Sequence, residues 1–428
     1  MDAPPGSDVT LTNLPKKTTY EGILKVAGRV NPFPVTVQDD QPEHVIGYGA
    51  TGIVWSVTDP RNGRRVALKA MRNRFQSLGS TKRAFREIRM LCFFKHENVL
   101  SALDLVQPPA LGCFQEIYVV SELMATDLCK ILASPQPISE VHVKLYVYQI
   151  LRGLKYLVSA RIIHRDIKPG NLLVDHNCVL KICDFGLART EDPNEQRRMT
   201  QDVVTPYYRA PELLLGADHY GPAIDMWSVG CVFAELLGRR VLFQAMAPTQ
   251  LLDRITELLG TPELKDMSHG CDGARAYMLS RPHKPPSLAK LNSLSALATP
   301  EAVDLLIKML VFNPDKRITC VDALSHKYLT CGRWLYHQSL CSCCETSALG
   351  RTNATDLEPV ARHAFDDSFE LDLTSARRAK EEVHKFILER CAASHGVPLC
   401  INTESTVFPF FASVTVSYTQ PPTPHRWK

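Results

Sequence analysis

The stretch that decides the fold is "HRDIKPGN" at 164–171, followed by "DFG" beginning at Asp184. Within it, Asp166 can accept the proton of an attacking hydroxyl, and Lys168 can meet a terminal phosphate. Asn171 and Asp184 offer the hard oxygen ligands that Mg²⁺ prefers. Any one of these residues would also suit a helix cap or a solvated surface. Together and in this order they predict a site that transfers a phosphoryl group by positioning it and neutralising its charge.

A glycine-rich segment lies upstream at 46–54, "IGYGATGIV", with the pattern G-x-G-x-x-G. Glycine lets the backbone approach a phosphate closely. The same glycines occur in dinucleotide-binding folds and in plain hairpins, but a dinucleotide fingerprint opens into a helix. Here a strand pattern, "IVWSV", continues, and "RVALK" follows it. We therefore expect a loop over nucleotide phosphates, formed by Ile46, Gly47, Tyr48, Gly49, Ala50, Thr51, Gly52, Ile53 and Val54.

A lysine at the end of "VALK", Lys69, would ordinarily be read as a surface residue. A helix is predicted over Ser80–Phe94, however, and it carries Glu87. An ion pair between Lys69 and Glu87 would aim the ammonium at the α- and β-phosphates. The glycine loop, lysine, glutamate, catalytic loop, "DFG" and "APE" (210–212) occur in the order found in protein kinases.

The pattern of hydrophobic residues predicts a small β-rich lobe followed by a larger helical lobe, and with the order of motifs above it indicates the α+β, two-lobed protein kinase fold. Short β-branched runs predominate before residue 124, and helical spacing predominates after it. The segment 223–237, "AIDMWSVGCVFAELL", is apolar on nearly every face, so it predicts a central buried helix. We expect a loosely ordered leader at 1–41, a β-rich N-lobe at 42–123, a helical C-lobe at 124–330, and an extension at 331–428 with Cys-rich, acidic and helical segments, the helix at Ser375–Arg390.

Composition favours a soluble globular protein and gives little sign of other classes. The 428 residues are 45% hydrophobic and 22% charged, and the net charge of 49 − 45 = +4 is too small to predict direct nucleic-acid binding. The sequence has no signal-peptide pattern and no run of about 18 apolar residues, so we expect no membrane span. Fourteen scattered cysteines indicate reduced thiols and hence the cytosol or nucleus.

Several longer strings resemble the proline-directed branch of the protein kinases, among them "TPYYRAPELLLG" and "FNPDKRITCVDALSHKYL". Within that branch the chain resembles the Nemo-like kinase family of atypical mitogen-activated protein kinases. The resemblance covers about 42 to 407 and includes "IGYGATGIVWSVTDPRNGRRVALK", "MTQDVVT" and "VPLCIN". The chain departs from that family at Asp202, where glutamate is usual, and at Ala50-Thr51-Gly52, which replaces Ala-Phe-Gly.

The resemblance implies activation by phosphorylation of Thr200, with the phosphate bound by an arginine cluster. Asp202 stands where dual-phosphorylated relatives carry tyrosine. One interpretation makes it a permanent, weaker substitute for a second phosphate, paired with Arg209; the other makes it a solvated loop acid. The matching phosphate-binding positions are Arg86, Arg165 and Arg189.

The resemblance also implies a nucleotide pocket with Ser121 as gatekeeper and a hinge running from Glu122 to Met124. Its counterpart of an acidic docking site for basic partner motifs lies in "FDDSFELDL" at 365–373. A solvated acidic loop would have the same composition, so both interpretations stay open. The carboxylates concerned are Asp366, Asp367, Glu370 and Asp372.

The activity implied is a serine/threonine protein kinase that uses ATP and Mg²⁺ and acts on Ser/Thr-Pro sites. Family members phosphorylate transcription regulators such as T-cell factor/lymphoid enhancer factor proteins in Wnt signalling, respond to upstream kinases and self-associate. They act in the cytoplasm and nucleus. The alternative is a catalytically weak kinase-fold scaffold that acts through docking surfaces.

A cysteine-rich stretch contains Cys341, Cys343 and Cys344, with Cys331 nearby. Zinc sites commonly use paired C-x₂-C motifs or histidine pairs, and this spacing matches neither. The sequence therefore favours free thiols over a zinc site.

Overall fold

The structure is a computed structural model that describes residues 44–49, 52–59, 63–106, 108, 110–191, 206–245, 247–347 and 350–393. The predicted leader at 1–41 lies outside the described residues. Four predicted site residues also lie outside them, namely Ala50, Thr51, Thr200 and Asp202. Tyr48 and Gly49 are described only as backbone of a strand.

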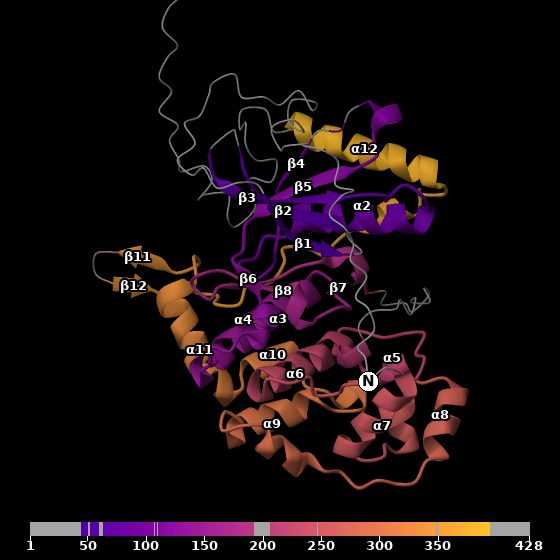
Figure 1. The fold of residues 1–428 in the computed structure, drawn as a ribbon, viewed down its shortest axis with the longest axis vertical. Helices are drawn as coiled ribbons and strands as arrows, with labels where there is room; N and C mark the ends of the chain where they lie inside the picture. The colour runs from indigo at the N-terminus through magenta and orange to yellow at the C-terminus, as the bar shows by residue number, and fades with distance from the viewer. Residues whose placement is uncertain are drawn as a thin grey trace, which may run out of the picture.

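The N-lobe is built on a five-stranded antiparallel sheet in the order β1-β2-β3-β5-β4 (Figure 1). Its strands do not alternate strictly between buried and half-buried positions: β3 carries runs of buried residues and β4 is buried throughout, and their side chains contribute to two separate hydrophobic clusters. The register sets Val54 opposite Lys69, and Lys69 in turn opposite Val119. The strands are β1 (His44–Gly49), β2 (Gly52–Thr58), β3 (Arg65–Met71), β4 (Ala102–Leu105) and β5 (Ile117–Glu122).

Helix α2 (Leu78–Phe93) packs against this sheet. The helix predicted over Ser80–Phe94 is confirmed, and it begins two residues earlier because Ser77 caps it. The Ser77 hydroxyl accepts a hydrogen bond from the backbone N–H of Ser80, which satisfies a free donor of the first turn. The stripe that includes Phe85 and Ile88 is buried, so the face that carries Glu87 is fixed in rotation.

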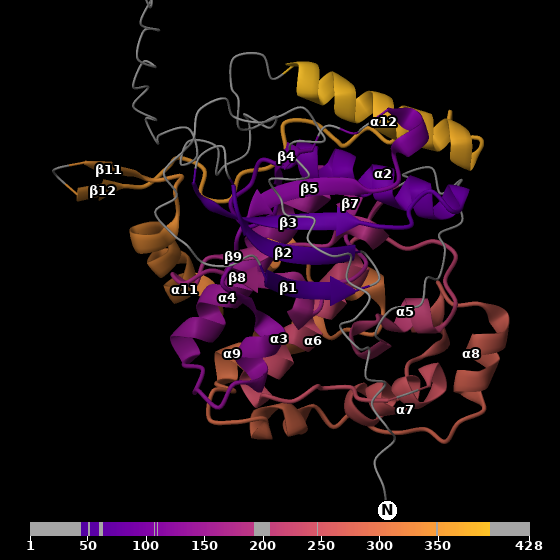
Figure 2. The same cartoon turned by 45° about the horizontal axis from the view of Figure 1, so that its top comes forward.

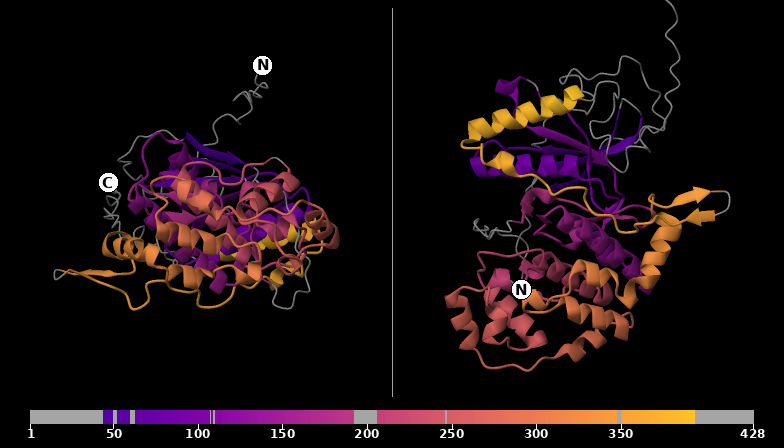
Figure 3. Two further views of the ribbon diagram at one scale, coloured as in Figure 1. Left: turned by 90° about the horizontal axis from the view of Figure 1, so that it is seen from below. Right: turned by 180° about the vertical axis from the view of Figure 1, so that it is seen from behind.

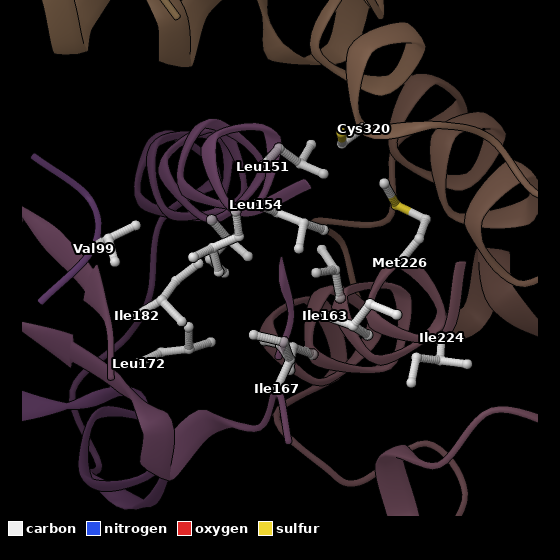
Figure 4. Close-up of a cluster of buried hydrophobic side chains, with 14 of the residues drawn as sticks. Val99, Leu151, Leu154, Ile163, Ile167, Leu172, Ile182, Ile224, Met226 and Cys320 are labelled. Atoms are coloured by element: carbon white, nitrogen blue, oxygen red, sulfur yellow. The ribbon is translucent and has the colours of Figure 1, made fainter. Parts of the chain in front are cut away.

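The C-lobe is helical and surrounds α6 (Ala223–Gly238), whose residues Ile224 to Leu237 are all buried. The prediction of a central buried helix is therefore confirmed. Figure 4 shows aliphatic side chains from α4 and α6 meeting those of the catalytic-loop region, including Leu154, Ile163 and Ile167. The other C-lobe helices are α3 (Leu128–Ala133), α4 (Glu140–Ser159), α5 (Pro211–Leu214), α7 (Pro248–Leu259), α8 (Asp272–Leu279), α9 (Pro300–Met309), α10 (Cys320–Leu324) and α11 (Thr330–Leu335).

Short strands at the top of the C-lobe position the loops that carry the predicted catalytic residues. The chain from Ile163 to Leu172 connects two of these strands, and Asp184 follows a third by two residues. The strands are β6 (Thr126–Asp127), β7 (Ile162–Ile163), β8 (Leu172–Val174), β9 (Leu180–Ile182) and β10 (Arg189–Thr190). A parallel bridge from Val99 to Ile182 ties this layer to the N-lobe side of the chain.

The C-terminal extension runs from the C-lobe back to the N-lobe (Figure 2). After α11 it contains a hairpin, β11 (Glu345–Ser347) and β12 (Gly350–Thr352), and its last described element is α12 (Ala376–Ala393). The helix predicted over Ser375–Arg390 is thus confirmed. Seen from behind, α12 lies along α2 (Figure 3), and the rings of Phe369 and Phe386 pack on Phe85.

Within the described residues, no helix is both long enough and apolar enough to cross a bilayer. No cysteine there forms a disulfide.

Candidate active site

The glycine-rich loop is described on both of its strands, and one of its glycines is required by geometry. Gly49 pairs with Gly52 across β1 and β2. Gly52 has φ +141°, and a Cβ there would lie 2.2 Å from the carbonyl oxygen of Ala70 on β3. Gly47, by contrast, would meet nothing within 4 Å. Glycine at 52 therefore lets the loop fold tightly over the sheet, whereas glycine at 47 leaves space above it.

Lys69 and Glu87 form the predicted ion pair, with Lys69 Nζ 2.6 Å from Glu87 Oε1. The same ammonium lies 3.8 Å from Asp184 Oδ1, so the two lobes meet at this lysine. Burial is the largest influence on the pKa of Lys69 and lowers it, but the carboxylates of Glu87 and Asp184 together outweigh burial and raise the pKa. Burial also raises the pKa of Glu87, and Lys69 only partly offsets this. Lys69 thus stays a cation, as phosphate binding requires.

The catalytic loop holds Asp166 by hydrogen bonds from two other predicted residues. Lys168 Nζ donates to Asp166 Oδ2 at 2.7 Å, and Asn171 Nδ2 donates to the same oxygen at 2.8 Å. Asn171 Nδ2 also lies 2.8 Å from the Asp166 carbonyl oxygen. These donors fix the carboxylate orientation, which is the main requirement for a group that must orient an attacking hydroxyl.

Asp225 supports this loop from below, a role that the sequence analysis did not assign. Its two carboxylate oxygens accept hydrogen bonds from the backbone N–H groups of His164, at 2.7 Å, and Arg165, at 2.8 Å. Burial raises the pKa of Asp225, while these N–H groups and nearby positive charge oppose the rise. The sequence signal for this role is an acid at the start of an otherwise apolar helix. A carboxylate buried there needs hydrogen-bond partners, which predicts that it holds a neighbouring loop.

Asp184 and Asn171 are suited to hold a divalent metal ion. Asp184 adopts the left-handed region, with φ +64°, and its Oδ1 is buried without a hydrogen-bond partner among the described residues. Cys183 N donates to Asn171 O at 3.0 Å, which keeps the two segments adjacent. Because Asn171 uses its amide nitrogen on Asp166, its amide oxygen is left as a ligand. A carboxylate oxygen that accepts no hydrogen bond and an amide oxygen on an adjacent segment match the ligand preference of Mg²⁺.

The predicted gatekeeper and hinge residues lie at the end of β5 and directly after it. Ser121 is half-buried opposite Ala67 of β3, and its hydroxyl donates to the Glu122 carbonyl oxygen at 3.4 Å. Lys181 Nζ lies 3.1 Å from Glu122 Oε1. Met124 is half-buried in the connection to the C-lobe.

The arginines predicted to bind a phosphate fall into two groups. Arg189 on β10 pairs in register with Ile163 of β7, which sets it near Arg165 in the catalytic loop. Arg86 on α2 instead binds Glu370 of the extension, at 2.5 and 2.6 Å. Burial lowers the pKa of Arg209, and the charge of Asp166 opposes this effect.

The four acids predicted to form a docking site have different surroundings. Glu370 is engaged by Arg86, and Asp367 accepts a hydrogen bond from the Thr190 hydroxyl at 2.5 Å. Asp366 accepts one from Ser368 N at 2.9 Å, and Asp372 is exposed. The docking role of this stretch remains a prediction.

The fold and these side chains define a protein kinase, and the protein kinase domain model matches residues 41–329. The chain is 61% identical over 378 residues to the serine/threonine-protein kinase NLK2 of Xenopus laevis, covering 88% of this chain and 84% of that protein. It is 52% identical over 403 residues to the serine/threonine kinase NLK of Caenorhabditis elegans, covering 92% and 63%. The extracellular signal-regulated kinase 1 of Dictyostelium discoideum is 46% identical over 66% of this chain and 53% of its own length.

The chain belongs to the NLK family of serine/threonine protein kinases, which is of the mitogen-activated type. As a protein kinase it uses ATP and a divalent metal ion, and its substrates are proteins.

Proposed function

We propose that this kinase transfers the γ-phosphoryl group of Mg²⁺-bound ATP to serine or threonine followed by proline. The observation that carries the proposal is a connected set of contacts: Lys69 binds Glu87 at 2.6 Å and lies 3.8 Å from Asp184, while Lys168 binds Asp166 at 2.7 Å. Asn171 links the two groups, because its Nδ2 donates to Asp166 Oδ2 at 2.8 Å and its carbonyl oxygen accepts from Cys183 N at 3.0 Å. A catalytically weak scaffold would have no need to keep this buried charge aligned.

Each of these side chains has a distinct task in the proposed reaction. Asp166 orients the acceptor hydroxyl and takes its proton, while Lys168, already bound to Asp166, shields the charge of the transferred group. Lys69 holds the α- and β-phosphates in line. Asn171 and Asp184 would hold Mg²⁺, which supplies neutralisation of the phosphate oxygens. Asp184 Oδ1 supports that role, because it accepts no hydrogen bond from the described residues and has only the Lys69 ammonium 3.8 Å away.

Specificity for proline after the acceptor is proposed to involve Arg209. Arg209 ends a short turn that is closed by its backbone N–H donating to Pro206 O at 3.0 Å, and the charge of Asp166 raises the pKa of its side chain. In the same segment, Tyr208 is anchored through its hydroxyl to Glu235 at 2.7 Å and through its carbonyl oxygen to Ser228 at 2.7 Å. A segment that is held in this way suits contact with a proline ring, because proline has no backbone N–H that needs a hydrogen-bond acceptor.

Activation is proposed to depend on phosphorylation of Thr200, with Asp202 contributing a constant negative charge. One donor supports this: Nη1 of Arg86 is buried and has no hydrogen-bond partner among the described residues, although Nε and Nη2 bind Glu370. A phosphate oxygen would satisfy that donor, and charge-assisted hydrogen bonds of this type order activation loops. Thr200→Ala should then reduce turnover to near background, whereas equal turnover by wild type and variant would refute this part.

The activity itself is tested with the full chain, radiolabelled ATP and a Ser-Pro peptide. Asp166→Asn keeps the side chain's size but removes the base, so kcat should fall by about 10²–10⁴. Asp272→Asn, at an exposed carboxylate on α8, is the matched control and should retain wild-type turnover. Labelling by Asp166→Asn equal to that of the control would overturn the proposal. Equal labelling of Ser-Pro and Ser-Ala peptides would remove only the proline preference.

The physiological setting is proposed from the family. We infer substrates among transcription regulators, including T-cell factor/lymphoid enhancer factor proteins of Wnt signalling, upstream activating kinases, self-association, and action in both cytoplasm and nucleus. Co-purification of such regulators with the Asp166→Asn chain would support the first of these, and an unbiased phosphoproteome without them would count against it.

A further inference from the structure

One group of side chains outside the active site has the geometry of a metal site. His337, Cys341, Cys343 and Cys344 each bring a nitrogen or sulfur atom to within 4.8 Å of the others. His337 Nδ1 lies 3.5 Å from Cys343 Sγ and 3.6 Å from Cys344 Sγ, and the two sulfurs are 3.9 Å apart. In a tetrahedral zinc site the bonds are about 2.3 Å to sulfur and about 2.05 Å to nitrogen. These bond lengths need a separation of roughly 3.6 Å between a nitrogen and a sulfur ligand and roughly 3.8 Å between two sulfur ligands. The three distances above match those values.

The local backbone explains how such close sequence positions converge. A π-helical turn, η10 (Tyr336–Leu340), extends α11, and Cys341 N donates to Tyr336 O at 2.9 Å to close it. This wider turn places Cys341 beside His337, and π turns of this kind occur frequently at functional sites. Cys343 and Cys344 then come from the bend before β11. The set is buried except for Cys343, which is half-buried.

The surroundings supply the outer hydrogen bonds that a metal site needs. His337 Nε2, the nitrogen away from the sulfurs, lies 2.8 Å from the hydroxyl of the buried Tyr148 on α4. A metal-binding histidine nearly always has such a partner on its second nitrogen, which fixes the ring orientation. Ala354 N donates to Cys344 Sγ at 3.4 Å.

Charge balance also favours a bound dication. Arg351 Nη2 lies 3.1 Å from Cys341 Sγ, and the fully buried Arg152 has its Nη2 3.6 Å from Cys343 Sγ. Arg152 also pairs with Glu97 at 2.9 Å. Two guanidiniums and one carboxylate sum to +1, while three thiolates with a dication sum to −1, so the filled site is neutral overall. Neutral thiols would leave the excess positive charge unbalanced.

We propose that His337, Cys341, Cys343 and Cys344 form a structural zinc site of the Cys₃His type. All four positions are protein ligands, so no position is left for water or substrate, as in structural rather than catalytic zinc sites. Free thiols were favoured from the sequence because the cysteines form no paired motif; the structure brings His337, four positions before the first cysteine, against the sulfurs. A single H-x₃-C-x-C-C segment thus supplies the whole set.

The site would anchor the start of the extension to the C-lobe. After the β11–β12 hairpin, the chain returns to the C-lobe: Arg152 Nε donates to Leu357 O at 2.7 Å, and Glu358 binds Arg333. Further along, Ala361 N and Phe365 N bond to the end of α4, at Ser159 Oγ and Ala160 O. Loss of the ion should therefore speed hydrogen exchange in residues 351–365 before it affects the N-lobe sheet.

The proposal is tested by elemental analysis of the full chain purified under reducing conditions without chelator. We expect one zinc ion per chain in wild type and in Cys331→Ser, a control at an exposed cysteine outside the cluster. Cys344→Ser and His337→Ala should lose that ion. Absence of zinc from wild type, zinc retained by every variant, or iron with inorganic sulfide in its place would each overturn the assignment.

A conservative variant keeps the test valid if the loss variants fold poorly. His337→Cys converts the site to four cysteines, which also bind zinc tetrahedrally, so it should restore one ion per chain. In the cobalt(II)-substituted protein, its thiolate-to-cobalt absorption should be stronger than in wild type, because a fourth thiolate has been added. Failure of His337→Cys to bind either metal while remaining folded would contradict the proposed ligand set.

Discussion

Replacing Glu370 with alanine is expected to destabilise the folded chain by about 3 kcal/mol. Glu370 binds Arg86 through both carboxylate oxygens, at 2.5 and 2.6 Å. Arg86 is only 5% exposed, so the variant would leave a buried charge without its partner, which costs about 3–5 kcal/mol. The Glu370 side chain keeps 14% of its surface exposed. Water can therefore reach the vacated space, and the lower end of that range applies.

Thermal unfolding followed by calorimetry measures this effect. A domain of this size loses roughly 2 °C in Tm per kcal/mol, so Glu370→Ala should unfold roughly 6 °C below wild type. Glu370→Gln retains one acceptor oxygen and should lose less. Asp372→Ala removes an exposed carboxylate two residues away and should change Tm by no more than about 1 °C. If Glu370→Ala and Asp372→Ala unfold at the same temperature, the ion pair does not stabilise the extension and the reasoning fails.

Three further predictions concern other parts of the molecule. Gly52→Ala should lower Tm in matched assays, whereas Gly47→Ala should leave Tm unchanged, because of these two positions only 52 would set a Cβ against backbone; equal Tm for the two variants would contradict this. Burial, with help from nearby positive charge, holds the pKa of His96 well below its usual 6.5. As the pH falls below 6.5, the histidine is therefore protonated in the unfolded chain before it is protonated in the folded chain. The free energy of unfolding should fall by about 1 kcal/mol between pH 6.5 and about 5.5. His96→Gln should flatten this part of a denaturant-unfolding pH series; an unchanged slope would contradict it. Asp225→Asn replaces one buried acceptor oxygen by an N–H donor that faces backbone N–H groups. Urea unfolding should show a free energy of unfolding lower by about 1–3 kcal/mol, and activity assays should show a lower kcat. Wild-type values for both would refute the proposed support of the catalytic loop by Asp225.

The elements set by local patterns were predictable from the sequence. Helix α2 follows from the spacing of its apolar residues, and the Ser77 cap would have corrected its start to Leu78. The contact between Lys69 and Glu87 was predictable because motif order fixes their strand and helix. In each case the signal lies within one segment or in an ordered set of motifs.

The contacts of the extension were not predictable in the same way. Glu370 and Arg86 are 284 positions apart, and a run of acids indicates only that the carboxylates are solvated, paired or available to a partner. His337 had no significance until the π turn placed it against three sulfurs. Both depend on how the chain returns to its own surface, which neither composition nor periodicity encodes.

The path of the extension gives it a direct bearing on phosphate handling. The chain is tied to α4 near Leu357 and to α2 at Glu370, and Arg86 stands next to Glu87 in sequence. The Lys69–Glu87 pair needs α2 in one rotation, and the Arg86–Glu370 pair ties the next residue of that helix to the extension. Because packed elements of this kind shift between discrete positions rather than deforming smoothly, a loosened extension would displace Glu87 together with its helix. The extension therefore acts as a third support of the catalytic ion pair, alongside the sheet and the DFG segment.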